Sequence, residues 1–579
     1  MDFRDKNILH IPSLQGLAAH HFHKGWNVLV ILVFALVFVV VFSMIVPYNM
    51  DEFLYYDTIL CHRFPGNNFH GNCDPFQLKI LGTSLIAPLR SYDYVGSFPA
   101  LYFLPIVLLW SSPLAARLLG MVFLIAGGFL AARAFSFKPK YVVPALILTF
   151  PYLFQHLVDT GPIGVQIFFV FLLYVLLDRW CTTQRWRTIG AITLVTFLGI
   201  WTKPTFFWFA PGLAIFLLVH VVRHRQKLRM PVHRRVFLRQ GAAALAVLFG
   251  LLVLLFLSSA PDDPAVRPFF QQLMNSQSYS FSEFVRGAWL TSPSLYAFLH
   301  PLEATQRIYA VLPETALSRL FSIVHYFTVP VVLLALAVFA RKFPRRTLIL
   351  PAALYVSFLL TIMMVIRTKD SWAMHHAILS YPFLILSILA TIRCALDANL
   401  SIHRRWIHVM LLAWGTAFVE LNITFFALFP TQTYQVHTTP EKLMVQRIIN
   451  TGSIPGRTIV LTLDWGMFYY SGLFGSSQKS VLFEWGLDDP HRVEYLQNLA
   501  REHNRKLVML STPRETSVNV PLLKWLMKME PCSATPPGSD WTVYFEPDDE
   551  IRATCDRYAA AKAQPSLVRR LLLQASLTR

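Results

Sequence analysis

Two adjacent carboxylates, Asp51 and Glu52, follow a long apolar run and are able to do acid–base chemistry. Carboxylates near a membrane surface are costly to dehydrate, so the pair needs water, a cation or a reacting partner. A solvated loop turn is the simpler alternative. The same loop contains Arg63 and Lys79, which could hold an anionic lipid head group against a carboxylate.

Other charged residues stand at the ends of apolar runs further along the chain. Asp159 lies in a short turn, and capping of a helix that begins near Pro162 is a sufficient structural explanation for it. A role of Asp159 in a binding or catalytic site would be additional to capping. Basic residues at the corresponding ends of other runs are Lys203, Lys369, His375 and His376. The simpler interpretation is that these side chains extend their charged ends into water at the membrane surface. Their convergence with carboxylates at one face favours a site for a phosphate-bearing substrate.

Composition indicates that lipid is the solvent for most of the chain. Of its 579 residues, 55% are hydrophobic and 14% charged, and the mean hydropathy is +0.48. The net charge of +19 could suggest nucleic acid. However, the basic residues form short clusters between apolar runs, as the positive-inside rule predicts for cytoplasmic loops.

The apolar runs predict a polytopic α-helical membrane protein with about eleven transmembrane helices. The first follows a basic segment without a small-residue cleavage site, so we expect a retained span. The predicted spans are 27–46, 113–133, 141–158, 161–180, 188–202, 204–222, 239–258, 318–340, 347–366, 372–393 and 406–429.

The basic clusters orient these spans. With residues 1–26 in the cytoplasm, every cluster falls inside, and the loops 47–112 and 258–316 and the tail 430–579 fall outside. A further apolar run at 98–110 would invert the later loops if it crossed alone. We expect it to lie along the membrane surface or to form a hairpin with 76–89.

The cysteines fit this orientation. Cys61 and Cys73 share the first outer loop and Cys532 and Cys555 share the tail, so we expect a first-loop disulfide and a tail disulfide. Cys181 and Cys394 lie beside inner clusters and are expected as free thiols.

The tail 430–579 predicts a soluble α/β domain with a partly parallel sheet. Strand-like runs occur at 458–463, 480–485, 506–511 and 541–545, with a helix-like run at 490–503. The tail contains no recognisable catalytic motif, so a lid or an acceptor-docking module without chemistry of its own is the simpler interpretation.

Several short motifs resemble the polytopic glycosyltransferases of the GT-C superfamily, such as protein O-mannosyltransferases and bacterial aminoarabinose transferases. Asp51-Glu52 resembles their first-loop acidic pair, and Ala115-Ala116-Arg117-Leu118 their Ala-Arg-Leu helix start. Asp159 is similar to their second-loop acidic position, and the segment from His375-His376 through Tyr381-Pro382 resembles their basic/aromatic helix start. The Lys-Pro-Pro segment of aminoarabinose transferases is absent, which argues against lipid A modification.

The resemblance implies transfer of a sugar from a polyprenyl-phosphate carrier to an acceptor hydroxyl on a glycan, lipid or protein, with inversion. Asp51 would be the general base, and Arg63, Lys79, Lys203, Lys369, His375 and His376 would bind the donor phosphate. Glu52 or Asp159 would position the acceptor or hold a divalent cation, and the sequence does not decide between these roles.

Two other classes remain open: a transporter or flippase of lipid-linked substrates, because charged groups near spans also mark conduction paths, and a scaffold that uses the tail alone. No internal repeat of broken helices supports a transporter. The outer segments lack a convincing glycosylation sequon, which favours a bacterial inner membrane with a periplasmic tail.

Overall fold

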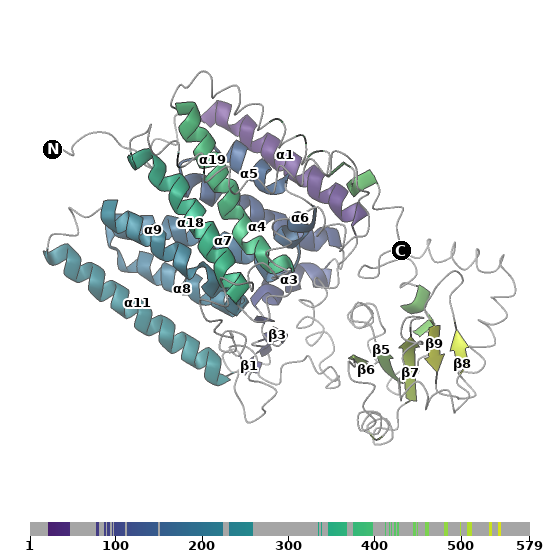
Figure 1. Ribbon diagram of the computed structural model, residues 1–579. Helices are drawn as coiled ribbons and strands as arrows, with labels where there is room; N and C mark the ends of the chain where they lie inside the picture. Colours follow the sequence, from purple (N-terminus) through teal and green to yellow (C-terminus); the bar gives the residue numbers. More distant parts are fainter. Residues whose placement is uncertain are drawn as a thin grey trace. The chain divides into compact units, whose positions relative to one another are not determined.

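The computed structural model describes two units of the chain (Figure 1). Contacts group Met1–Val46 with Phe76–Gln432, and Pro47–Pro75 with Thr433–Arg579. Apart from single positions, the residues described are 21–46, 77–79, 86–88, 90–92, 95–96, 98–109, 113–148, 151–223, 231–258, 345–367, 374–397, 458–462, 480–483, 506–511, 532–534 and 542–545.

The first unit is helical, and six of its described segments begin with proline, whose fixed φ and missing N–H suit a helix start. The α-helices are α1 (His21–Ile45), α3 (Phe98–Leu109), α4 (Pro113–Ala134), α5 (Pro139–Ile147), α6 (Pro151–Val158), α7 (Pro162–Thr183), α8 (Trp186–Thr202), α9 (Ala210–Arg223), α11 (Pro231–Ser258), α18 (Arg345–Arg367) and α19 (Tyr381–Asp397). Two 3₁₀ segments, η3 (Pro204–Phe209) and η6 (Met374–Ser380), precede α9 and α19.

Seven helical stretches in the described residues are long and apolar enough to cross a membrane, by length and composition. The chain is thus a polytopic helical membrane protein. The seven stretches are 28–45, 114–134, 162–183, 204–222, 232–254, 347–365 and 377–394, and each overlaps a predicted span. The predicted spans 318–340 and 406–429 lie outside the described residues except at isolated positions.

The prediction of one continuous span at 141–158 is wrong. Instead, α5 ends at Ile147 and α6 begins at Pro151, whose missing N–H suits the start of a helix and not its interior. The predicted span 188–202 is α8, which has 17 residues.

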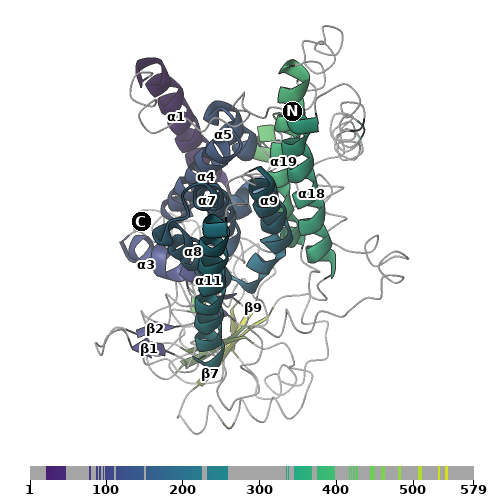
Figure 2. The same cartoon turned by 90° about the vertical axis from the view of Figure 1, so that its left-hand side faces the viewer.

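The core of the bundle lies along α7, which lies beside α4, α8 and α9. In the apolar stretch of α7, 67% of the residues are buried, whereas in that of α11 only 6% are buried. Figure 2 shows α4 and α7 between α1 and α18. Aromatic rings fill the centre, where Tyr174 of α7 packs 4.4 Å from Phe216 of α9 and 5.5 Å from Phe135 after α4. Such ring pairs contribute beyond their buried area.

Two small hairpins precede α3. Strands β1 (Gln77–Lys79) and β2 (Ile86–Pro88) pair antiparallel, as do β3 (Arg90–Tyr92) and β4 (Val95–Gly96). The described residues within 76–89 are thus strands, and the run at 98–110 contains the 12-residue α3, which packs against α4 and α8.

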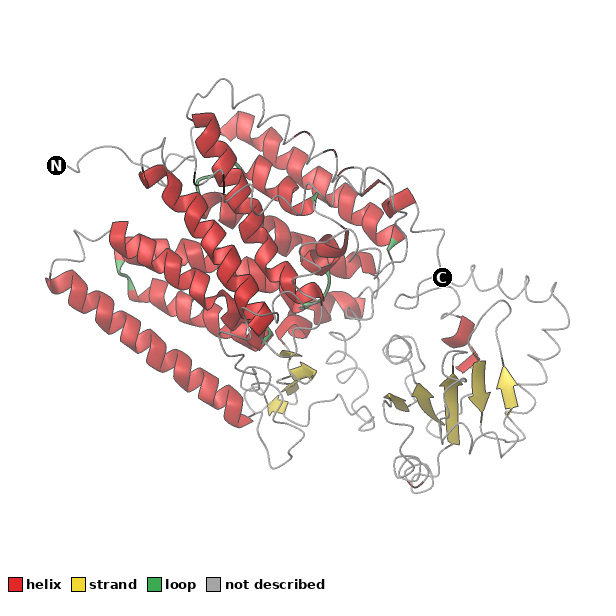
Figure 3. Cartoon of the chain, in the orientation of Figure 1, coloured by secondary structure: helices red, strands yellow, loops and turns green. Residues whose placement is uncertain are grey.

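The second unit contains a five-stranded sheet in the order β6-β5-β7-β9-β8 (Figure 3). Its strands are β5 (Thr458–Thr462), β6 (Ser480–Phe483), β7 (Lys506–Ser511), β8 (Cys532–Ala534) and β9 (Thr542–Phe545). β5 pairs parallel with β6 and β7, while β9 pairs antiparallel with β7 and β8. The predicted partly parallel sheet is confirmed, and β8 is an additional strand. The predicted helix at 490–503 lies outside the described residues except for one position.

Candidate functional site

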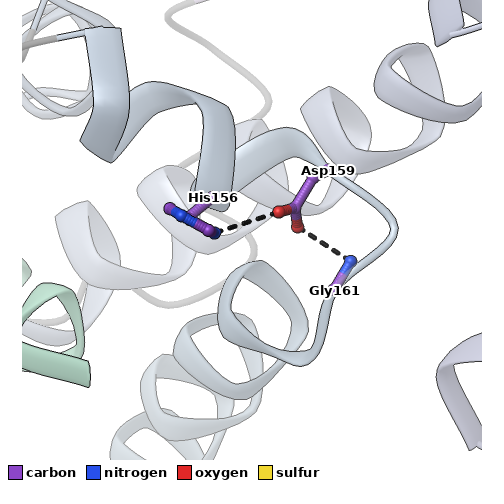
Figure 4. A network of polar contacts seen from close by, with 3 residues as sticks. All are labelled: His156, Asp159 and Gly161. Atoms are coloured by element: carbon purple, nitrogen blue, oxygen red, sulfur yellow. Dashed lines mark hydrogen bonds and ion pairs between the residues drawn. The ribbon is translucent and has the colours of Figure 1, made fainter. Parts of the chain in front are cut away.

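The turn between α6 and α7 holds a buried carboxylate. Asp159 is 4% exposed, and its Oδ2 lies 3.1 Å from Nδ1 of His156 (Figure 4). Its Oδ1 accepts a hydrogen bond of 2.8 Å from the backbone N–H of Gly161. A carboxylate with hydrogen-bond donors at both oxygens can remain in a dry environment, so the turn keeps a charge-bearing group inside the protein.

The prediction that Asp159 caps α7 needs correction. The N-cap residue of α7 is Gly161, with φ −73° and ψ 172°, and α7 has no capping hydrogen bond from an N-cap side chain. Asp159 instead makes a local side-chain turn two residues earlier, a geometry that aspartate adopts readily. Capping therefore does not account for the residue.

A tyrosine of α3 carries a second buried polar group. The hydroxyl of Tyr102 is buried and forms no hydrogen bond with any residue that the structure describes. A buried hydroxyl normally has a partner, so this one is suited to receive a ligand's polar group.

Lys203 lies where α8 meets η3, as the Lys203-Pro204 pair predicted. It is 3% exposed, and its backbone carbonyl accepts a hydrogen bond of 2.8 Å from Nε2 of Gln166 in α7. Thr205 in η3 donates to the other side of the same amide at 3.4 Å. Lys203 is therefore fixed against α7, the helix that directly follows Asp159.

The first two turns of α4 contact the ends of two other helices, α1 and α6. The fully buried Arg117 donates a hydrogen bond to the carbonyl of Val46 at the end of α1, and its guanidinium lies 5.1 Å from the Phe42 ring centre. One turn further on, a Cβ added to Gly120 would lie 1.9 Å from the carbonyl oxygen of Val158, directly before Asp159. One helix start thus contacts the ends of both α1 and α6.

We call this end of the helical unit, where α1, α6 and α8 end, the carboxylate end. The segment η6, which includes His375 and His376, lies beside α6, α7, α18 and α19 at this end. Lys79 is the last residue of β1. The remaining predicted site residues lie outside the described residues: Asp51, Glu52, Arg63 and Lys369.

The cysteine predictions are tested only in part. Cys181 and Cys394 are buried free thiols, as expected. Cys532 begins β8, whereas Cys61, Cys73 and Cys555 lie outside the described residues, so both disulfides stay predictions. No group of three or more His, Cys, Asp or Glu that could hold a metal ion occurs among the residues described, and the divalent cation also stays a prediction.

Sequence reasoning missed His156, Tyr102 and Gln166. The spacing of three between His156 and Asp159 was a usable signal, because residues three apart are neighbours on one helical turn. Tyr102 and Gln166 had no such signal, since each lies in an otherwise apolar run, and the contact of Gln166 with Lys203 arises only through tertiary packing.

No protein-family profile and no curated protein sequence matches this chain. Among solved structures, the chain is similar to the crystal structure of ArnT from Cupriavidus metallidurans bound to undecaprenyl phosphate, with a TM-score of 0.49 and 14% sequence identity. The similarity covers 91% of this chain and 99% of the ArnT chain.

Proposed function

We propose that this protein is a membrane glycosyltransferase of the GT-C type, which moves a sugar from a polyprenyl-phosphate carrier to an acceptor hydroxyl at the carboxylate end. The observation that carries the proposal is the start of α4. It contacts the end of α1, five residues before Asp51, and the end of α6, one residue before Asp159. The ends of two helices that are distant in sequence, each followed in the chain by an acidic residue, are thereby held by one short helical segment.

The reaction requires a base and a phosphate site. In the proposal, Asp51 takes the proton of the acceptor hydroxyl while its oxygen attacks the anomeric carbon of the sugar. The bond from that carbon to the phosphate oxygen breaks, its electron pair leaves with the carrier phosphate, and the anomeric configuration inverts. No enzyme nucleophile is needed.

Burial strengthens the electrostatic interaction between a cationic side chain and the leaving phosphate. Lys203 is almost fully buried, and a cation in a site poor in water stabilises developing negative charge more than an exposed one does. His375, on η6, would approach the same phosphate. Asp159, held by His156, and the Tyr102 hydroxyl are suited to position the acceptor.

A transporter or flippase is the second candidate, and one observation favours it. Asp178 of α7 and His220 of α9 form a largely buried pair at 3.2 Å, and ionisable pairs within spans are found along conduction paths. This pair lies toward the opposite ends of α7 and α9 from the carboxylate end.

The two Asp–His pairs, one at each end of the helical unit, provide a matched test. Purified protein in detergent would be incubated with radiolabelled polyprenyl-phosphate sugars and a mixture of membrane lipid and glycan acceptors, and labelled product would be separated from donor. A transferase forms product without two compartments, whereas a transporter does not. We expect Asp159→Asn to lose about 100-fold or more of the transfer rate, in the range for a misplaced reactant, and Asp178→Asn to keep most of it.

Thermal unfolding and size-exclusion profiles of both variants serve as folding controls. Absence of product with every donor would refute the proposed function. Equal loss in two equally stable variants would refute the placement of the site at the carboxylate end.

A further inference from the structure

The opposite end of the helical unit carries a cluster of exposed arginines from three helices. We call this end, where α4 and α7 end and α8 and α11 begin, the arginine end. The cluster consists of Arg179, Arg185, Arg187, Arg234, Arg235 and Arg239. None of these six side chains has an ion pair or hydrogen bond to another residue in the part of the chain that the structure describes.

Buried hydrogen bonds hold these helices together beneath the arginines. Gln184, in the left-handed conformation with φ 52°, ends α7; its Oε1 lies 2.9 Å from Nδ1 of His233 in α11. Its backbone carbonyl accepts a 2.7 Å hydrogen bond from Gln240, whose Oε1 accepts one from the Trp180 indole at 2.7 Å. The Trp180 ring also stacks on Phe237 at 4.2 Å.

This network brings the arginines of separate helices together. Arg185 directly follows Gln184, and Arg234 directly follows His233, so the hydrogen bond between the two partners places these arginine backbones near each other. The nearby acid Asp178 is already engaged with His220 at 3.2 Å. The cluster therefore presents positive charge without a described carboxylate to neutralise it.

An exposed apolar stripe begins beside the cluster on α11. At 100° per residue, Leu238, Leu245 and Phe249 lie on the same flank of α11 as Arg234. They are 58%, 69% and 70% exposed, respectively. The stripe from Leu238 to Phe249 is about 16 Å long at 1.5 Å per residue, a length suited to an acyl chain. Trp186, 59% exposed at the start of α8, is a typical residue of the membrane interface.

We propose that Arg185, Arg187 and Arg234 bind the phosphate head group of an anionic phospholipid whose acyl chains lie along the stripe on α11. Guanidinium groups match phosphate oxygens in a bidentate geometry. Basic pockets between membrane helices are known settings for anionic head groups. A lipid with two phosphodiester groups should bind more tightly than one with a single group, because several arginines are available. This site is separate from the carboxylate end and independent of the proposed reaction.

The test is native mass spectrometry of the full-length protein in detergent with tetraoleoyl cardiolipin, dioleoyl phosphatidylglycerol or dioleoyl phosphatidylcholine added. The variant Arg185→Gln/Arg187→Gln/Arg234→Gln removes the proposed head-group contacts. Each arginine near an anionic surface contributes roughly fivefold to the binding constant, so we expect about 100-fold weaker cardiolipin binding.

A matched control removes three exposed charges elsewhere at the arginine end: Arg133→Gln/Lys138→Gln/Lys140→Gln. This control should bind cardiolipin as the unmodified protein does, and both triple variants should keep their thermal unfolding temperature. If both triple variants bind cardiolipin equally weakly, the lipid is held by the overall positive charge of this end, and the proposed site is overturned. Equal binding of the three lipids, or displacement of cardiolipin by inorganic phosphate alone, would also overturn it.

Discussion

The close contact between α4 and α6 makes Gly120 a sensitive position. A Cβ at Gly120 would lie 1.9, 2.5 and 2.8 Å from the carbonyl oxygen, carbonyl carbon and Cα of Val158, whereas ordinary contacts begin at 3.4 Å. All three atoms are backbone, so no side-chain rotation relieves the clash. Gly120→Ala therefore requires the two helices to separate by about 1.5 Å, and such overpacking costs roughly 1 to 3 kcal/mol of folding free energy.

The same movement would displace Asp159, which directly follows Val158. A misplacement of about 1 Å can cost roughly 100-fold in rate where a reactant must be held in position. We therefore expect Gly120→Ala to lower both thermal stability and sugar transfer, each measured on detergent-purified protein, by thermal unfolding and by the radiolabelled assay.

Gly190 supplies the control for this substitution. It lies within α8, and a Cβ added there meets no atom within 4 Å. Gly190→Ala should leave transfer unchanged and stabilise the helix by about 0.5 to 1 kcal/mol, the usual gain of alanine over glycine in a helix. If both variants unfold at the same temperature, the tight α4–α6 packing is wrong. If Gly120→Ala is destabilised but transfers normally, Asp159 has no part in the reaction.

Three further predictions concern the parts of the chain that carry the expected base and the tail. Asp51→Asn should reduce the rate of sugar transfer by about 10²- to 10⁴-fold while the protein still binds the donor lipid. Asp57→Asn, which changes another acid six residues further along the same loop, is the control and should have little effect. If Asp51→Asn retains more than about a tenth of the transfer rate, Asp51 is not the base. Mass spectrometry of unreduced peptides should find the first-loop and tail disulfides, each contributing roughly 3 kcal/mol, and free thiols at those positions would contradict the pairing. A C-terminal alkaline phosphatase fusion should be active and a green fluorescent protein fusion dark, since the tail is expected outside; the reverse pattern would invert the topology.

Hydrophobic length was enough to predict most of the bundle, because a helix in lipid must be apolar over its whole span. The tail sheet was also predictable, since runs such as 458–463 and 506–511 are rich in branched residues with few alternatives to a buried strand. The break between α5 and α6 was not recognised, because Pro144 and Pro151 stand in a segment whose mean apolarity still resembles a single span.

The candidate site was predictable in its residue types and less so in its geometry. Asp159 and Lys203 stand out as charged residues in apolar surroundings, and both are buried at turns of the carboxylate end. The His156 contact with Asp159 is local to one turn. The contact of Gln166 with Lys203 instead depends on which helices pack together. A single sequence does not show which helices pack together, so hydrogen bonds between helices could not be predicted.

The division of residues 139–158 into α5 and α6 has a consequence for biosynthesis. The stretch contains three prolines and the polar side chains of Gln155 and His156, and both polar residues are buried in the folded protein. A segment released alone into lipid would expose these polar side chains. We therefore expect the translocon to hold this segment until α4 and α7 are available on either side of it, so that the three enter the bilayer as one assembly unit.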